Sequence, residues 1–89
     1  MIFLDMVIDK FDVLSKMIHE GVKPKRIVAI MRALEEEGVD EIEVGMDEKD
    51  WFMIVKVGDC HGVSKRFKDD EWNGFRGFMI ALMRALGVK

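Results

Sequence analysis

Three cations come together at one point of the chain and form its most plausible ligand-binding group. Lys23, Lys25 and Arg26 flank a proline that is well suited to the first turn of a helix, which we predict over residues 24–37. The N–H groups at the start of a helix already favour anions, so cations there carry an electrostatic cost that a bound phosphate would relieve. We take these three residues, together with Arg32, as candidate anion- or nucleic-acid-binding residues.

The segment 17–34 resembles a helix-turn-helix motif. Gly21 and Val22 stand at the turn, and Ile27 and Ile30 occupy positions where that motif places inward-facing apolar residues. The cations of the second helix would then face the groove of a nucleic acid. The alternative is a surface helix joined to its neighbour by a tight turn, and the formal net charge of −3 argues against a general nucleic-acid binder.

Two further groups contain ligand-type side chains but predict no site. Cys60 and His61 are adjacent in an expected hairpin turn, where they cannot close a tetrahedral metal site, and only His19 could add another imidazole. Catalytic Cys–His pairs normally come from separate elements. The acidic segment 47–50 lacks the spacing of a calcium-binding loop. We therefore expect no metal, no cofactor and no enzymatic activity.

The elements that must position these residues predict a single α+β domain over residues 1–89. Apolar spacing and turn residues predict helices over 2–20, 24–37 and 70–86, and strands over 41–46, 51–58 and 63–68. Each helical pattern is followed by Gly-Val, at 21–22, 38–39 and 87–88, which is typical of a helix end. The expected order is α-α-β-β-β-α, with a three-stranded antiparallel meander packed against the helices.

Apolar surface exceeds what one such domain would bury. The first predicted helix has two apolar stripes, nearly opposite each other, and which of them faces the core stays open. One stripe contains Leu4, Val7, Phe11, Leu14 and Ile18; the other contains Ile2, Met6, Val13 and Met17. The middle strand is apolar on both faces. The face toward the helices is expected to carry Ile42, Val44, Met53, Val55, Val57, Val63 and Phe67, and the opposite face to carry Glu43, Phe52, Ile54, Lys56 and Arg66.

This surplus predicts self-association. The candidate interface residues are Met6, Val13, Met17, Phe52 and Ile54. A single cysteine predicts a reducing cytoplasm, and no segment is apolar enough to cross a membrane. The absence of Gln and Thr beside 35% charged residues suggests a thermophilic source. The sequence thus predicts a small, non-enzymatic, homo-oligomeric protein; the alternative is a nucleic-acid-binding module.

Overall fold

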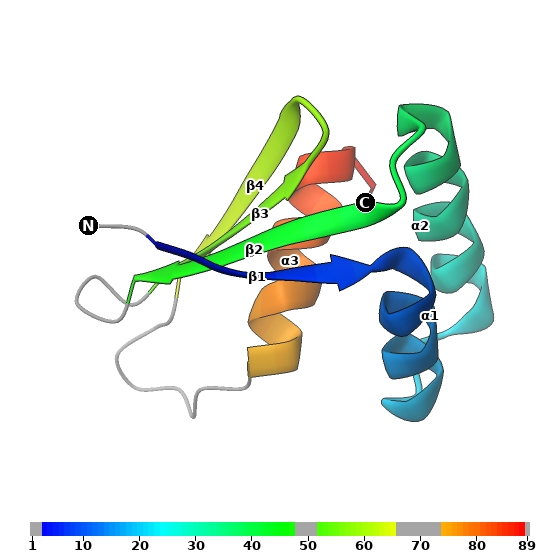
Figure 1. Cartoon of the computed structure of the whole chain (residues 1–89). Helices are drawn as coiled ribbons and strands as arrows, with labels where there is room; N and C mark the ends of the chain where they lie inside the picture. Colours follow the sequence, from blue (N-terminus) through cyan, green and yellow to red (C-terminus); the bar gives the residue numbers. More distant parts are fainter. Residues whose placement is uncertain (1–2, 48–51, 66–73, 89) are drawn as a thin grey trace.

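The computed structural model describes residues 3–47, 52–65 and 74–88, and Figure 1 shows their arrangement. An antiparallel sheet carries one helix on a face and two helices at one end. The α+β class predicted from the sequence is confirmed, but the element order and the number of strands differ from the prediction. The elements are β1 (Phe3–Asp9), α1 (Lys10–His19), α2 (Pro24–Glu37), β2 (Glu41–Asp47), β3 (Phe52–Val57), β4 (Cys60–Lys65) and α3 (Gly74–Leu86).

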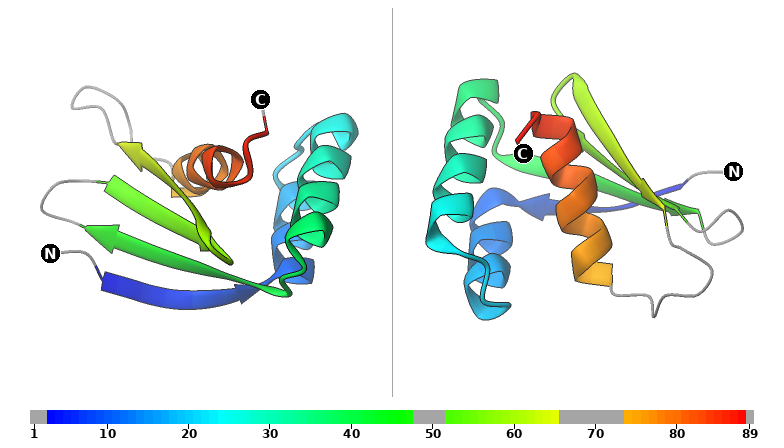
Figure 2. Two further views of the ribbon diagram at one scale, coloured as in Figure 1. Left: turned by 90° about the horizontal axis from the view of Figure 1, so that it is seen from above. Right: turned by 180° about the vertical axis from the view of Figure 1, so that it is seen from behind.

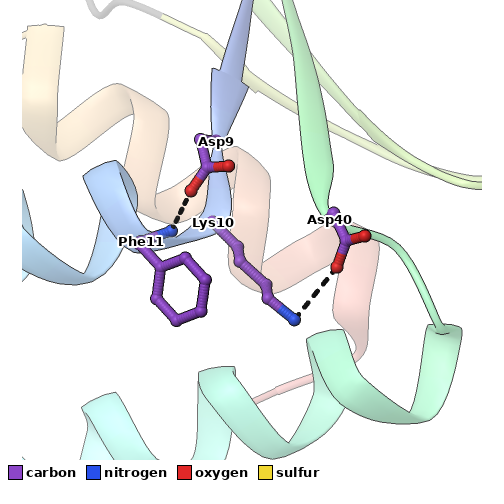
Figure 3. A network of polar contacts seen from close by, with 4 residues as sticks. All are labelled: Asp9, Lys10, Phe11 and Asp40. Atoms are coloured by element: carbon purple, nitrogen blue, oxygen red, sulfur yellow. Dashed lines mark hydrogen bonds and ion pairs between the residues drawn. The ribbon is translucent and has the colours of Figure 1, made fainter.

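The first described element is a strand, whereas the sequence predicted a helix over residues 2–20. β1 pairs with β2, and the carboxylate of Asp9 then caps α1 by accepting a hydrogen bond of 2.8 Å from the backbone N–H of Phe11 (Figure 3). The N–H of Lys10 continues the pairing by donating to the carbonyl oxygen of Asp40 at 2.9 Å. The apolar residues before Asp9 fit both helical and strand spacing, so pairing with β2 decides between the two.

Among the described residues, the sheet has four strands in the order β1-β2-β3-β4, and each neighbouring pair is antiparallel. β1 carries a register shift between Leu4 and Met6, a bulge of the kind often found in edge strands. The predicted meander therefore corresponds to β2–β4, and β1 adds a fourth strand beside β2. Figure 2 shows α3 on one face of this sheet and α1 with α2 at one end. We call the face toward α3 the inner face and the opposite one the outer face.

The last strand begins three residues earlier than predicted. Val57 pairs with Cys60, so only Gly58 and Asp59 form the turn, and Gly58 adopts a positive φ of 58°. Such a turn suits a two-residue hairpin. Because side chains alternate along a strand, the shift places Val63 on the outer face, opposite Ile54, and not on the inner face as predicted. The predicted inward Phe67 and outward Arg66 lie outside the described residues, as does the predicted start of the last helix.

α3 packs against β3 and β4 at very short range. A Cβ atom on Gly62 would overlap the carbonyl oxygen of Ala81 and the backbone nitrogen of Ala85. Beside it, the buried hydroxyl of Ser64 donates a hydrogen bond of 2.8 Å to the carbonyl oxygen of Gly77. The small residues Ala81 and Ala85 on α3 therefore allow a close approach to β4.

The core lies between the inner face and the three helices. Its largest fully buried side chains come from every helix and from the three strands β2, β3 and β4: Val13, Met17, Ile30, Leu34, Ile42, Val55, Val57, Ser64 and Leu82. The helix ends agree with the sequence, since Gly21, Gly38 and Gly87 each adopt a positive φ between 68° and 78°. α2 has the predicted bounds, 24–37.

Candidate functional site

The outer face of the sheet has no helix on it among the described residues, as both views in Figure 2 show. Most antiparallel sheets that face water carry polar residues on that side. Here the central positions are apolar: Ile54 and Val63 lie opposite each other in the β3–β4 pair, and Phe52 lies two residues from Ile54. All three are partly exposed, and Val7 on β1 is 57% exposed. This apolar surface is the strongest candidate for a functional site.

A hollow lies at the β4 side of the outer face. It has a volume of about 320 Å³ and is lined by Phe52, Val63, Lys65 and Arg84. Arg84 belongs to α3, and its guanidinium donates a hydrogen bond of 2.6 Å to the carbonyl oxygen of Val63. The carbonyl oxygen of Val63 on the edge strand β4 is thus already hydrogen-bonded to Arg84. This bond reduces the ability of the edge to pair with another strand.

The residues predicted for self-association lie in three different places. Phe52 and Ile54 are on the outer face, as predicted, and are partly exposed. Met6 is 52% exposed but lies on the inner face, because it pairs with the inward-facing Val44. Val13 and Met17 are 2% and 0% exposed, so they are core residues that a second copy cannot contact. Only two of the five residues therefore share one accessible surface.

The other apolar stripe of the first segment is the exposed one. Phe11 and Ile18 on α1 are 61% and 62% exposed, while Leu14 between them is half-buried. The ammonium of Lys10 lies 5.4 Å from the centre of the Phe11 ring and 3.1 Å from a carboxylate oxygen of Asp40 (Figure 3). The sequence identified both stripes, and only the packing of α1 on the core determined that Val13 and Met17 point inward.

The candidate anion-binding residues are divided between two surfaces. Lys23 and Arg26 line an open groove of about 490 Å³ between the α1–α2 turn and α3, whereas Lys25 and Arg32 are exposed on α2 and do not line it. Apolar side chains also line the groove, and α3 contributes Arg76, which the sequence analysis did not identify. This residue was missed because no local pattern connects α3 to the start of α2. The remaining lining residues are Glu20, Gly21, Val22, Phe75, Met79, Ile80 and Met83.

The helix-turn-helix likeness of segment 17–34 is not supported by the arrangement of its helices. Figures 1 and 2 show α1 and α2 side by side and running in opposite directions. This is an αα-hairpin, whereas a helix-turn-helix motif crosses its helices steeply so that the second can enter a groove. Cations on α2 can still meet an anion, but the geometry of that motif does not position them.

The Cys60–His61 pair lies at the start of β4. The thiol of Cys60 donates to a carboxylate oxygen of Glu37 at 3.7 Å. The negative charge of Glu37 is the main cause of a raised pKa of the Cys60 thiol. A raised pKa makes the reactive thiolate scarcer, which is the opposite of what a nucleophile needs. His61 is exposed on the outer face, because its neighbours in the strand face inward.

Within the described ranges, no group of three or more His, Cys, Asp or Glu side chains is placed to hold a metal ion, and no helix is long and apolar enough to span a membrane. Comparison of the chain with protein-family models, with curated proteins and with solved structures finds no significant match. The functional interpretation therefore rests on the geometry of this chain.

Proposed function

We propose that this chain is a small, non-enzymatic, self-associating protein whose homodimer forms through the outer face of the sheet. The observation that carries the proposal is the apolar centre of a sheet face that no described helix covers. Phe52, Ile54 and Val63 form a continuous group there, since Ile54 and Val63 are paired and Phe52 lies on the same side of β3. Contiguous apolar surface on a small protein is typical of a protein–protein interface.

The size of this face sets the expected affinity. Four strands about 4.8 Å apart, each about six residues long at about 3.4 Å per residue, cover roughly 400 Å² per copy. Stable interfaces bury about 800 Å² per partner, so the sheet face alone supplies about half of that area. We therefore expect a dimer with a dissociation constant on the order of 10 µM rather than a tight obligate one.

Sedimentation equilibrium tests the proposal over protein concentrations from roughly 1 to 500 µM, a range that brackets the expected affinity. The wild type should shift from monomer to dimer with increasing concentration. Ile54→Lys should remain monomeric, because a lysine at the centre of the face would have to lose its hydration in the dimer.

Val28→Lys is the matched control for this substitution. Val28 is 50% exposed and belongs to α2, which is not part of the outer face of the sheet. Its replacement should therefore leave the dimer intact. Circular dichroism checks that both variants remain folded. A wild type that stays monomeric at the highest concentration would overturn the proposal, and so would an Ile54→Lys variant that dimerises normally.

The second candidate function is binding of an anionic partner such as nucleic acid, and the groove beside α2 is the observation that favours it. Two of the four predicted cations line this groove together with Arg76 from α3. The cations at the start of α2 are joined here by a cation from a second element, α3, and all of them line one groove. Such contacts to phosphates would make the affinity fall steeply with salt.

Fluorescence anisotropy with labelled duplex DNA, single-stranded DNA and RNA at low salt tests this second candidate. Lys23→Glu/Arg26→Glu should abolish binding, because both residues line the groove. Lys25→Glu/Arg32→Glu is the control with the same change in net charge outside the groove, and it should weaken binding less. If none of the three nucleic acids binds at about 50 mM salt, this second function is excluded.

A further inference from the structure

The charged residues on the outer face are divided between its two halves. Alternation along the strands and the observed register place acidic residues on β1 and β2, and basic residues or histidine on β3 and β4. The acidic set is Asp9, Glu41 and Glu43, and the opposite set is Lys56, His61 and Lys65. The apolar centre with Ile54 and Val63 lies beside this boundary. The face therefore has an acidic half and a basic half of similar size.

We propose that two copies of the chain pack these faces together about a two-fold axis that runs parallel to the strands, between β2 and β3. This arrangement rests on the proposed function and specifies how the dimer is built. Rotation about that axis places β2 of one copy over β3 of the other. Glu43 then faces Lys56 of the second copy, and by symmetry Lys56 faces the second copy's Glu43. At this level the acidic residue of each sheet covers the basic residue of its partner, and His61 of each copy lies opposite Val7 of the other.

The same rotation also determines which apolar residue lies at the centre of the interface. Gly45 and Ile54 are paired neighbours on β2 and β3, and both lie on the outer face. Rotation about the proposed axis places Ile54 of one copy over Gly45 of the other, so the two Ile54 side chains do not lie against each other; Gly45 itself is buried within each copy. The same axis therefore places Glu43 against Lys56 and keeps the two Ile54 side chains apart.

Other arrangements of the same face are less favourable. A two-fold axis running across the strands at the level of Glu43 would stack β2 on β2 and place Glu43 against its own copy, where like charges repel. An acidic partner would meet the acidic half of the face, and a basic partner would meet the basic half. Glu43 and Lys56 exchange places under the proposed rotation, so a second copy of this chain complements the face. The geometry therefore specifies a second copy as the partner.

Two single charge reversals and their mixture test the arrangement. In Glu43→Lys, positions 43 and 56 are both basic, and in Lys56→Glu both are acidic. Each variant alone would place like charges opposite each other at two symmetric points, and we expect its self-association to weaken by about tenfold or more at low salt. Mixed in equal amounts, the two variants should form a heterodimer, because every facing pair then has opposite charges.

The mixture separates contacts between copies from contacts within one copy. Glu43 and Lys56 are also neighbours in the β2–β3 pair, so each reversal disturbs its own sheet in the mixture just as it does alone. Recovery on mixing must therefore come from contact between molecules. Sedimentation of each variant and of the mixture, with one variant carrying a fluorescent label, measures the heterodimer directly.

The outcomes distinguish failure of the arrangement from failure of the proposed function. A wild type that dimerises, with two variants that each weaken it and a mixture that restores it, supports the proposed axis. If the wild type dimerises but the variants do not weaken self-association, or if the mixture does not restore it, this axis is overturned while self-association stands. A wild type that is monomeric throughout overturns both, and binding of an unrelated protein to the face in place of a second copy also overturns the arrangement.

Discussion

Replacement of Gly62 by alanine tests the contact that holds α3 on the inner face and so leaves the outer face uncovered. The added methyl group would overlap the carbonyl oxygen of Ala81 and the backbone nitrogen of Ala85. These are main-chain atoms of a helix, so no side-chain rotation can relieve the overlap. α3 must therefore move away from β4 as a unit, and this displacement would stretch the hydrogen bond between Ser64 and Gly77.

The cost of Gly62→Ala follows from these two effects. Overpacking of a close contact typically costs about 1–3 kcal/mol, and weakening of a buried hydrogen bond adds about 1 kcal/mol. We expect a loss of about 2–4 kcal/mol in the free energy of unfolding. A domain of this size has roughly 5–10 kcal/mol in total, so the effect is large.

Urea unfolding followed by circular dichroism measures this loss, at one protein concentration for all variants because self-association adds stability. Gly87→Ala is the matched control. Gly87 has a φ of 70° and open space around its Cβ position, so alanine there costs only the backbone strain of about 1–2 kcal/mol. If Gly62→Ala is no more destabilising than Gly87→Ala, the close packing of α3 on β4 is refuted.

Three further predictions follow from local contacts. Asp9→Ala removes the cap of α1 and should lower the free energy of unfolding by about 1 kcal/mol in urea titrations, whereas an unchanged midpoint would contradict the cap. Glu37→Gln should lower the raised pKa of the Cys60 thiol and accelerate its alkylation by iodoacetamide near pH 8. Because that pKa is raised in the folded protein, its contribution to stability is present below the thiol's ordinary value of 9.0 and is lost as the pH rises above it. Lys25→Glu replaces a cation in the first turn of α2, which has no acidic residue, and should raise the thermal midpoint by the equivalent of about 0.5–1 kcal/mol; a lower midpoint would count against the dipole argument.

The helix ends and the whole of α2 were predictable because their signals are local. A glycine that must adopt a positive φ, followed by a residue that packs back on the last turn, determines a helix end without help from the rest of the fold. The N–H groups of Val22 and Val88 donate to the carbonyl oxygens of Met17 and Met83, at 3.0 Å in each case. The start of α2 at Pro24 follows from proline's fixed φ in the same way.

The first strand was not predictable from its own residues. The apolar positions between residues 3 and 9 fit a helical stripe and an alternating strand equally well. β1 forms because β2, more than 30 residues later in the chain, offers it a partner. The dependence on distant contacts also explains why Val13 and Met17 were wrongly assigned to the candidate interface. Both stripes of α1 are apolar, and only contact with the core distinguishes them.

The amino-acid sequence by itself determined the α+β class, the three helix ends and the bounds of α2, since each depends on residues near one another in the chain. Only the tertiary structure decided which surface stays exposed. The register of β4 places Val63 on the outer face, and the absence of a side chain at Gly62 allows α3 to pack closely on β4. The packing of α1 places Val13 and Met17 in the core. Register and helix packing depend on contacts between distant segments, and a side chain's own neighbours in sequence carry no information about them.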